Sequence, residues 1–184
     1  MKAMNNAILA LALLTTSAPL WAQAPVRDPD TGKYTYKAVT EVSNASDSIL
    51  FERGCRWYEG EFQTTQLNLR NLNDGMISHA GSFPVTFTIS GLTVEFQVAY
   101  NALVEARNGR YRYTITDFSL SQSAAGTTES VSLEGYIDRK FPFAKKTQRR
   151  VHGEVFAQVD IEVKKMVVRL TRVMSGGAFS TDDW

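Results

Sequence analysis

The sequence has few of the residues that most often carry catalysis or bind metals. Its 184 residues include one cysteine, Cys55, and only two histidines, His79 and His152. A single cysteine cannot form an internal disulfide, so stability must come from core packing. A reactive thiol would need a histidine or lysine nearby, and Cys55 has only arginines beside it, so we expect it to be a small buried residue. The histidines are far apart in sequence and have no cysteine or carboxylate at ligand spacing. We therefore expect no metal site.

Motifs for common enzyme chemistry are also missing. The chain has no glycine-rich phosphate loop, no Gly-x-Ser-x-Gly elbow and no dinucleotide fingerprint. Acidic residues that are near neighbours, such as Asp160 with Glu162, are typical of solvated surface and do not by themselves support acid/base catalysis. We expect a protein that is not an enzyme, with no catalytic residues and no cofactor.

No hydrophobic run is long enough to span a bilayer. The longest, residues 7–14, follows Lys2 and is followed by small residues that include Ala22. This pattern is typical of a cleaved export signal rather than a membrane anchor. We expect a signal peptide at residues 1–22, a periplasmic or extracellular location, and no integral membrane segment in the mature protein.

The mature chain has no excess of either charge. The full sequence carries 20 basic and 19 acidic residues, and loss of Lys2 with the signal peptide balances them. This balance gives no electrostatic reason for a polyanionic partner, so we expect no nucleic-acid binding. About 160 residues remain, which suits one domain. We assign a leader to residues 23–32, one domain to residues 33–174 and a mobile tail to residues 175–184.

The N-terminal half of the domain begins with a strand and a helix. Residues 34–42 alternate between apolar and polar side chains and predict the strand. Residues 44–62 then change to helical spacing, with Asn44 or Ser46 available as the cap. Gly54 lies in the middle of this helix, which indicates a close approach either to the sheet or to the packing partner of Trp57.

Period-two alternation follows, interrupted by turns at Asp74-Gly75, Ser90-Gly91 and Asn108-Gly109. For the last two turns, a two-residue hairpin places apolar residues opposite each other, for example Val85 opposite Phe96 and Val104 opposite Tyr113. In that register Glu105 faces Arg112 on the solvated side. The phase slips after Ile115, which predicts a bulge near Thr116 or Asp117.

The C-terminal part is harder to assign from pattern. Residues 121–145 show no sustained period and are interpreted as a long surface loop. Residues 146–174 fit either a strand pattern or a helix, and their length favours the helix. Its apolar stripe includes His152, Phe156 and Val159, and Gly-Gly ends it. The elements predict an α+β fold: a curved antiparallel sheet in β-α-β4-α order, with two helices packed on one face.

Three features resemble a known family, the domain of unknown function numbered 4468. They are the segment "LFERGCRWYEGEF" in the first helix, the strand "GRYRYTITDF" after the Asn-Gly turn, and the element order over residues 33–174. The resemblance implies a TATA-box-binding-protein-like fold and export in Bacteroidetes. It implies no activity, and so it assigns no functional residues.

Two functions remain open. The first is a non-catalytic binding or interaction module for a protein or glycan, using the long loop or the open face of the sheet, on which we expect Thr86, Glu95, Gln97, Glu105, Arg112 and Thr114. The second is a carrier of a small apolar ligand between the long helix and the sheet. The basic run Arg139, Lys140, Lys145, Lys146, Arg149 and Arg150, with Phe141 and Phe143, could touch an anionic membrane or glycan, although a solvated helix entrance is the simpler interpretation. The ligand-binding residues and oligomeric state cannot be read from the sequence.

Overall fold

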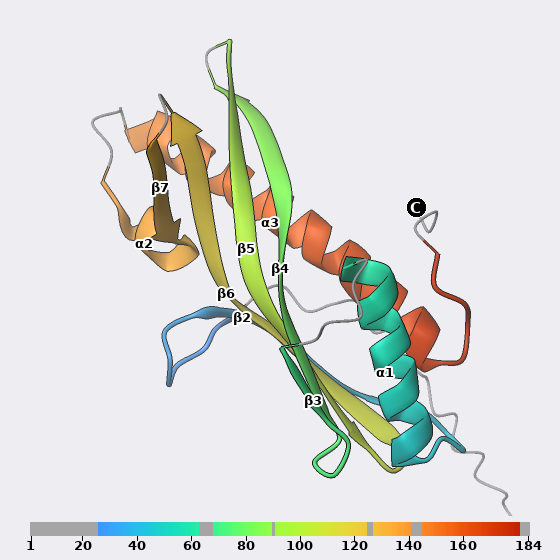
Figure 1. The fold of residues 1–184 in the computed structure, drawn as a ribbon. Coiled ribbons are helices and arrows are strands. Elements are labelled where there is room, and N and C mark those ends of the chain that lie inside the picture. Colours follow the sequence, from blue (N-terminus) through green and yellow to red (C-terminus); the bar gives the residue numbers. More distant parts are fainter. Residues whose placement is uncertain (1–25, 63–67, 90, 125–126, 141–144, 181–184) are drawn as a thin grey trace, which may run out of the picture.

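The computed structural model describes residues 26–62, 68–89, 91–124, 127–140 and 145–180. The predicted signal peptide, with Phe141 and Phe143, lies outside them. Figure 1 shows a curved sheet with helices on one face. Its elements are β1 (Val26–Arg27), β2 (Tyr34–Glu41), α1 (Asp47–Phe62), β3 (Leu69–Asn71), β4 (Met76–Ile89), β5 (Leu92–Arg107), β6 (Arg110–Ala124), β7 (Thr127–Ser132), α2 (Leu133–Asp138) and α3 (Lys145–Met174).

The strands form one antiparallel sheet, as predicted. Their order is β1-β2-β6-β5-β4-β3, and β7 pairs with the far half of β6. Both predicted hairpin registers are confirmed, since Val85 pairs with Phe96 and Val104 pairs with Tyr113. The α+β fold class and its two principal helices are therefore correct, while β1, within the predicted leader, extends the sheet by one short strand.

The predicted bulge lies at Asp117. Between the pairs Asn101–Thr116 and Ala99–Ser119, β6 has one more residue than β5. Asp117 has a φ of 59°, a left-handed conformation that aspartate tolerates better than most residues. Its carboxylate accepts hydrogen bonds from Lys33 and, at 3.1 Å, from Asn101. The Lys33 bond is the main reason that the pKa of Asp117 is lowered.

Helix α1 packs closely against the sheet. Ser46, rather than Asn44, caps it, because the Ser46 hydroxyl accepts a hydrogen bond from the Ile49 amide at 3.3 Å. A Cβ atom on Gly54 would lie 2.6 Å from Cδ1 of Ile77 in β4. The expected close approach of this glycine to the sheet is thus confirmed.

Helix α3 crosses the same face of the sheet as α1 (Figure 1). The predicted apolar stripe is confirmed from Val159 to Met174. Only its first two positions are wrong, because Val151 and Val155 are buried whereas His152 and Phe156 are half-buried. The helix ends at Met174, whose carbonyl accepts a hydrogen bond from Arg53 of α1 at 2.7 Å. In the predicted tail, Phe179 contacts Gly60 of α1; the mobility of the tail stays a prediction.

The prediction of a long loop at residues 121–145 is wrong for most of that segment. Residues 121–124 continue β6, residues 127–132 form β7, and residues 133–138 form α2. The Ser132 hydroxyl caps α2 by accepting a hydrogen bond from the Gly135 amide at 3.0 Å. Strand β7 contributes few apolar side chains and α2 is only six residues long, so neither produces a clear periodic signal.

Candidate functional site

The face of the sheet that points away from α1 and α3 is covered by no other described element (Figure 1). The six residues predicted for this face do lie on it. Thr86 pairs with Glu95, Glu105 pairs with Arg112, and the six side chains are exposed or half-buried. They span the length of the β4–β5 hairpin, so the set is a surface rather than a compact site.

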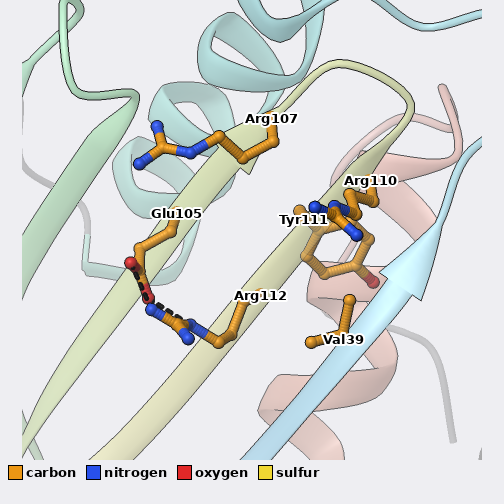
Figure 2. A pocket seen from close by; sticks show the side chains of 6 residues that line it. All are labelled: Val39, Glu105, Arg107, Arg110, Tyr111 and Arg112. Carbon is orange, nitrogen blue, oxygen red and sulfur yellow. Dashed lines mark hydrogen bonds and ion pairs between the residues drawn. The ribbon is translucent and has the colours of Figure 1, made fainter.

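This face has a depression at its end near the β5–β6 turn. A hollow of about 330 Å³, which we call the hairpin hollow, is open to solvent and is shown in Figure 2. Its lining residues come from β2, β5 and β6: Val39, Glu105, Arg107, Arg110, Tyr111 and Arg112. The Asn108-Gly109 turn brings β5 and β6 together here, and the pairing of β2 with β6 adds Val39 opposite Arg112.

Two of the arginines around this hollow are already engaged. Arg112 forms a bidentate pair with Glu105, with one nitrogen–oxygen distance of 2.5 Å. The hydrogen bond from Arg112 is the largest cause that lowers the pKa of Glu105, and the same bond raises the pKa of Arg112. Arg107 donates to the carbonyl oxygen of Asp74. Figure 2 shows Arg107 pointing away from Arg110, which separates the like charges that directly opposed positions would otherwise bring together.

Two other cations on this part of the face form no ion pair within the described residues. They are Lys37 on β2 and Arg110 on β6, both exposed. Basic residues outnumber acidic ones here, with Lys37, Arg107, Arg110 and Arg112 against Glu41 and Glu105. Val39, between them, is 54% exposed. The surface is therefore electropositive with an apolar centre.

A second hollow lies where α1 and α3 meet β4. It has a volume of about 390 Å³, and we call it the junction hollow. Glu61 at the end of α1 and Arg169 of α3 form a bidentate ion pair at 2.5 and 2.7 Å in its wall. Their side chains are only 9% and 11% exposed. Phe62, His79, Gly81, Phe83 and Tyr100 complete much of the lining.

A third hollow, of about 540 Å³, lies beside α3 rather than beneath it. We call it the flank hollow, and it is lined by Tyr34 of β2, Ile137 of α2 and α3 residues that include Phe156 and Ala157. Tyr34 and Phe156 contact each other edge to face, with ring centroids 5.1 Å apart. The hollow is open to solvent. Beneath α3 itself, Val155, Val159 and Val163 are fully buried in the core.

The residues that sequence alone marks as chemically interesting do not assemble into one site. His79 lies beside Phe62 and His152 beside Tyr136, in different hollows. Cys55 is 4% exposed, and burial raises the pKa of its thiol, which disfavours the reactive thiolate. Among the residues described, no group of three or more His, Cys, Asp or Glu side chains could hold a metal ion.

The basic run before and within α3 is exposed at its six charged positions, from Arg139 to Arg150. Over the described residues, no helix is both long and apolar enough to cross a membrane. Sequence reasoning missed Lys37, Val39 and Arg110 as parts of a surface. Alternation within residues 34–42 places Lys37 and Val39 on the face of the strand opposite to that of the buried Tyr36. It does not reveal that β2 pairs with β6.

The fold and its open face define a class: an α+β domain with a TBP-like fold, in which helices cover one side of a curved antiparallel sheet. Residues 36–121 match the family described as "Domain of unknown function (DUF4468) with TBP-like fold". The chain thus contains a DUF4468 domain, and the resemblance inferred from the sequence is confirmed. No curated protein matches the chain.

Two crystal structures share the fold. A TBP-like protein from Parabacteroides distasonis ATCC 8503 superposes with a TM-score of 0.66 at 14% identity, covering 84% of this chain and 98% of that one. A DUF4468 family protein from Bacteroides ovatus ATCC 8483 gives a TM-score of 0.64 at 15% identity, covering 87% of this chain and 95% of that one. At such identity the similarity concerns the fold and does not transfer a function.

Proposed function

We propose that the protein is an exported, non-catalytic binding module whose open sheet face binds an acidic segment of a partner protein. The observation that carries this proposal is the pair of exposed cations, Lys37 and Arg110, that have no ion-pair partner in the described structure and flank the exposed Val39. An acidic segment would complement their charge, and its apolar side chains would cover Val39. Nucleic acid is not proposed as a partner, because the overall charge is balanced.

The energetics favour a partner that contacts several of these groups together. A single exposed ion pair contributes about 0.2–1 kcal/mol and is screened by salt. Several cations on one surface instead raise the association rate and fix the orientation of an acidic partner. Arg107 is held in place by the carbonyl oxygen of Asp74, so it adds positive charge with little loss of side-chain freedom on binding, whereas the charge of Arg112 is balanced by Glu105.

A short oligoglutamate peptide tests this proposal directly. We expect it to perturb the amide NMR signals of β2 and the start of β6, with an affinity that falls as salt is added. The double substitution Lys37→Glu and Arg110→Glu should weaken binding at least about tenfold, because two attractive contacts become repulsive. The measurement is an NMR titration of the wild-type and the variant at one ionic strength.

A matched control reverses the same number of charges elsewhere. The variant Lys145→Glu, Lys146→Glu changes two exposed lysines at the start of α3 and should bind the peptide as the wild type does, apart from a small long-range effect. If this control loses binding while the β2–β6 variant retains it, the basic run of α3 is the acidic-partner site and the open-face proposal is wrong.

One observation favours a second function, a carrier of a small apolar ligand. The flank hollow has aromatic and aliphatic walls and enough volume for such a molecule. Native mass spectrometry of the mature protein from its natural host should then show the added mass of a bound molecule, which Ala157→Trp should displace by filling the hollow. A bare mass for the wild-type protein would contradict the carrier function and leave the binding module.

A further inference from the structure

The junction hollow has features of a ligand site that are separate from the open face. We propose that it binds an uncharged, polyhydroxylated ligand of the size of a saccharide ring. The main observation is Tyr100, which is 5% exposed, lines the hollow and makes no hydrogen bond through its hydroxyl to any described residue. This hydroxyl is therefore available to form a hydrogen bond with a ligand bound in the hollow.

A second polar group without a partner lies in the same wall. The Nδ1 atom of His79 is buried and has no hydrogen-bond partner among the described residues. The His79 ring packs edge to face against Phe62, at 4.7 Å between centroids. The Tyr100 hydroxyl and the buried His79 nitrogen belong to residues that line one hollow of about 390 Å³, and they indicate a place for a molecule that both donates and accepts hydrogen bonds.

The ion pair in the wall leaves further hydrogen-bonding capacity. Arg169 uses Nε and Nη2 for Glu61, so Nη1 takes no part in that pair. Each oxygen of Glu61 can accept more than one hydrogen bond. Because a hydroxyl group both donates and accepts, a ring bearing several hydroxyls could use Arg169, Glu61, Tyr100 and His79 together.

Aromatic rings supply the apolar part of the lining. Phe83 and Tyr100 have centroids 5.4 Å apart, and Phe62 and Tyr100 are 6.1 Å apart. Rings of this kind offer flat apolar surface to the C–H groups of a ligand while polar groups fix its orientation. A purely apolar ligand would leave Tyr100 and His79 unsatisfied, so it fits less well than a hydroxylated one.

The charges in the lining argue for a neutral ligand. Glu61 and Glu162 are acidic and Arg169 is basic, and Glu162 is itself paired with Lys165 at 3.0 Å. An anionic ligand would face the Glu61 and Glu162 carboxylates, and a cation would face Arg169. A neutral ligand meets neither penalty.

Gly81 allows the Tyr100 hydroxyl to lie close to β4. A Cβ atom at this position would lie 2.7 Å from the Tyr100 hydroxyl oxygen and would collide with Phe62. The φ angle of Gly81 is not in the left-handed region, so the need for glycine here is one of space. The absence of a side chain lets the Tyr100 hydroxyl and the Phe62 ring pack directly against β4 at this edge of the hollow.

An NMR titration of the full mature protein with glucose, galactose and N-acetylglucosamine tests the proposal. We expect at least one sugar to bind in the millimolar range and to shift the amide signals of Gly81 and Tyr100, while glucuronate binds more weakly. Tyr100→Phe should weaken binding about tenfold, the value of one hydrogen bond. Because that hydroxyl has no protein partner, the substitution should not lower the midpoint of urea unfolding.

Tyr113→Phe is the matched control. Tyr113 is 3% exposed, burial raises its pKa to about 12, and it does not line the junction hollow. Its substitution should leave sugar affinity unchanged. The proposal is overturned if none of the three sugars shifts Gly81 or Tyr100, or if Tyr100→Phe and Tyr113→Phe bind equally well. Neither result bears on the oligoglutamate experiment, which probes the opposite face of the sheet.

Discussion

Replacing Arg169 with methionine should lower the free energy of unfolding by about 3 kcal/mol, because the change leaves Glu61 charged and unpaired in a nearly buried position. Burial by itself would lower the pKa of Arg169, but the hydrogen bond and charge interaction with Glu61, together with the nearby Glu162 and Tyr100, outweigh burial and raise the pKa. This balance shows that the guanidinium is well paired where it lies. Urea unfolding at pH 7, followed by tryptophan fluorescence, measures the change.

Two comparisons separate the ion pair from general effects of substitution. In the double variant Arg169→Met, Glu61→Leu, both charges are gone, and most of the lost stability should return. Lys164→Met removes a cation from the same helix whose pair with Asp160 is more exposed, at 44% and 22%, and it should cost less than about 1 kcal/mol. Equal losses for Arg169→Met and Lys164→Met would show that the Glu61–Arg169 pair has no special role.

Gly54→Val should destabilise the protein by about 3 kcal/mol. The new Cβ atom would lie 2.6 Å from Cδ1 of Ile77 and 3.7 Å from Cγ1 of Val104, and Ile77 and Val104 are 0% exposed. Relief would require either a rotamer change in the core or movement of α1 away from β4, which is the cost of overpacking. The free energy of unfolding from urea titration is the measurement.

The same substitution at Gly153 is the control. Gly153 lies in α3 and a Cβ atom there would meet no heavy atom within 4 Å. Valine is a slightly better helix former than glycine, so Gly153→Val should change stability by no more than about 0.5 kcal/mol. A comparable loss at the two glycines would mean that valine in a helix, rather than contact with the sheet, explains the effect.

Local patterns predicted the parts of the fold that are fixed by neighbouring residues. The turns Ser90-Gly91 and Asn108-Gly109 determine which residues pair across each hairpin, and the observed registers agree. The phase slip after Ile115 located the bulge for the same reason. Strand β7 was missed because it pairs with the end of β6 and buries little of its own apolar surface.

The candidate sites depend on contacts that no local pattern contains. Glu105 and Arg112 could be paired from the hairpin register, since only seven positions separate them. Lys37 reaches the same surface only because β2 pairs with β6, and Glu61 meets Arg169 across 108 positions. Sequence spacing therefore predicted two of the six residues that line the hairpin hollow, Glu105 and Arg112, and it did not predict the junction hollow.

The pairing of β2 with β6 also has a consequence for the order of folding. Strands β4, β5 and β6 are joined by tight turns and can pair through local contacts, whereas Tyr36 pairs with Ile115, which is 79 positions later. Closing so long a loop is slow, so β2 should join the sheet late. A partner that binds across Lys37 and Arg110 would contact both β2 and β6 and would stabilise the pairing that forms last. Because this pairing is absent from an early transition state, the partner should slow unfolding more than it speeds folding.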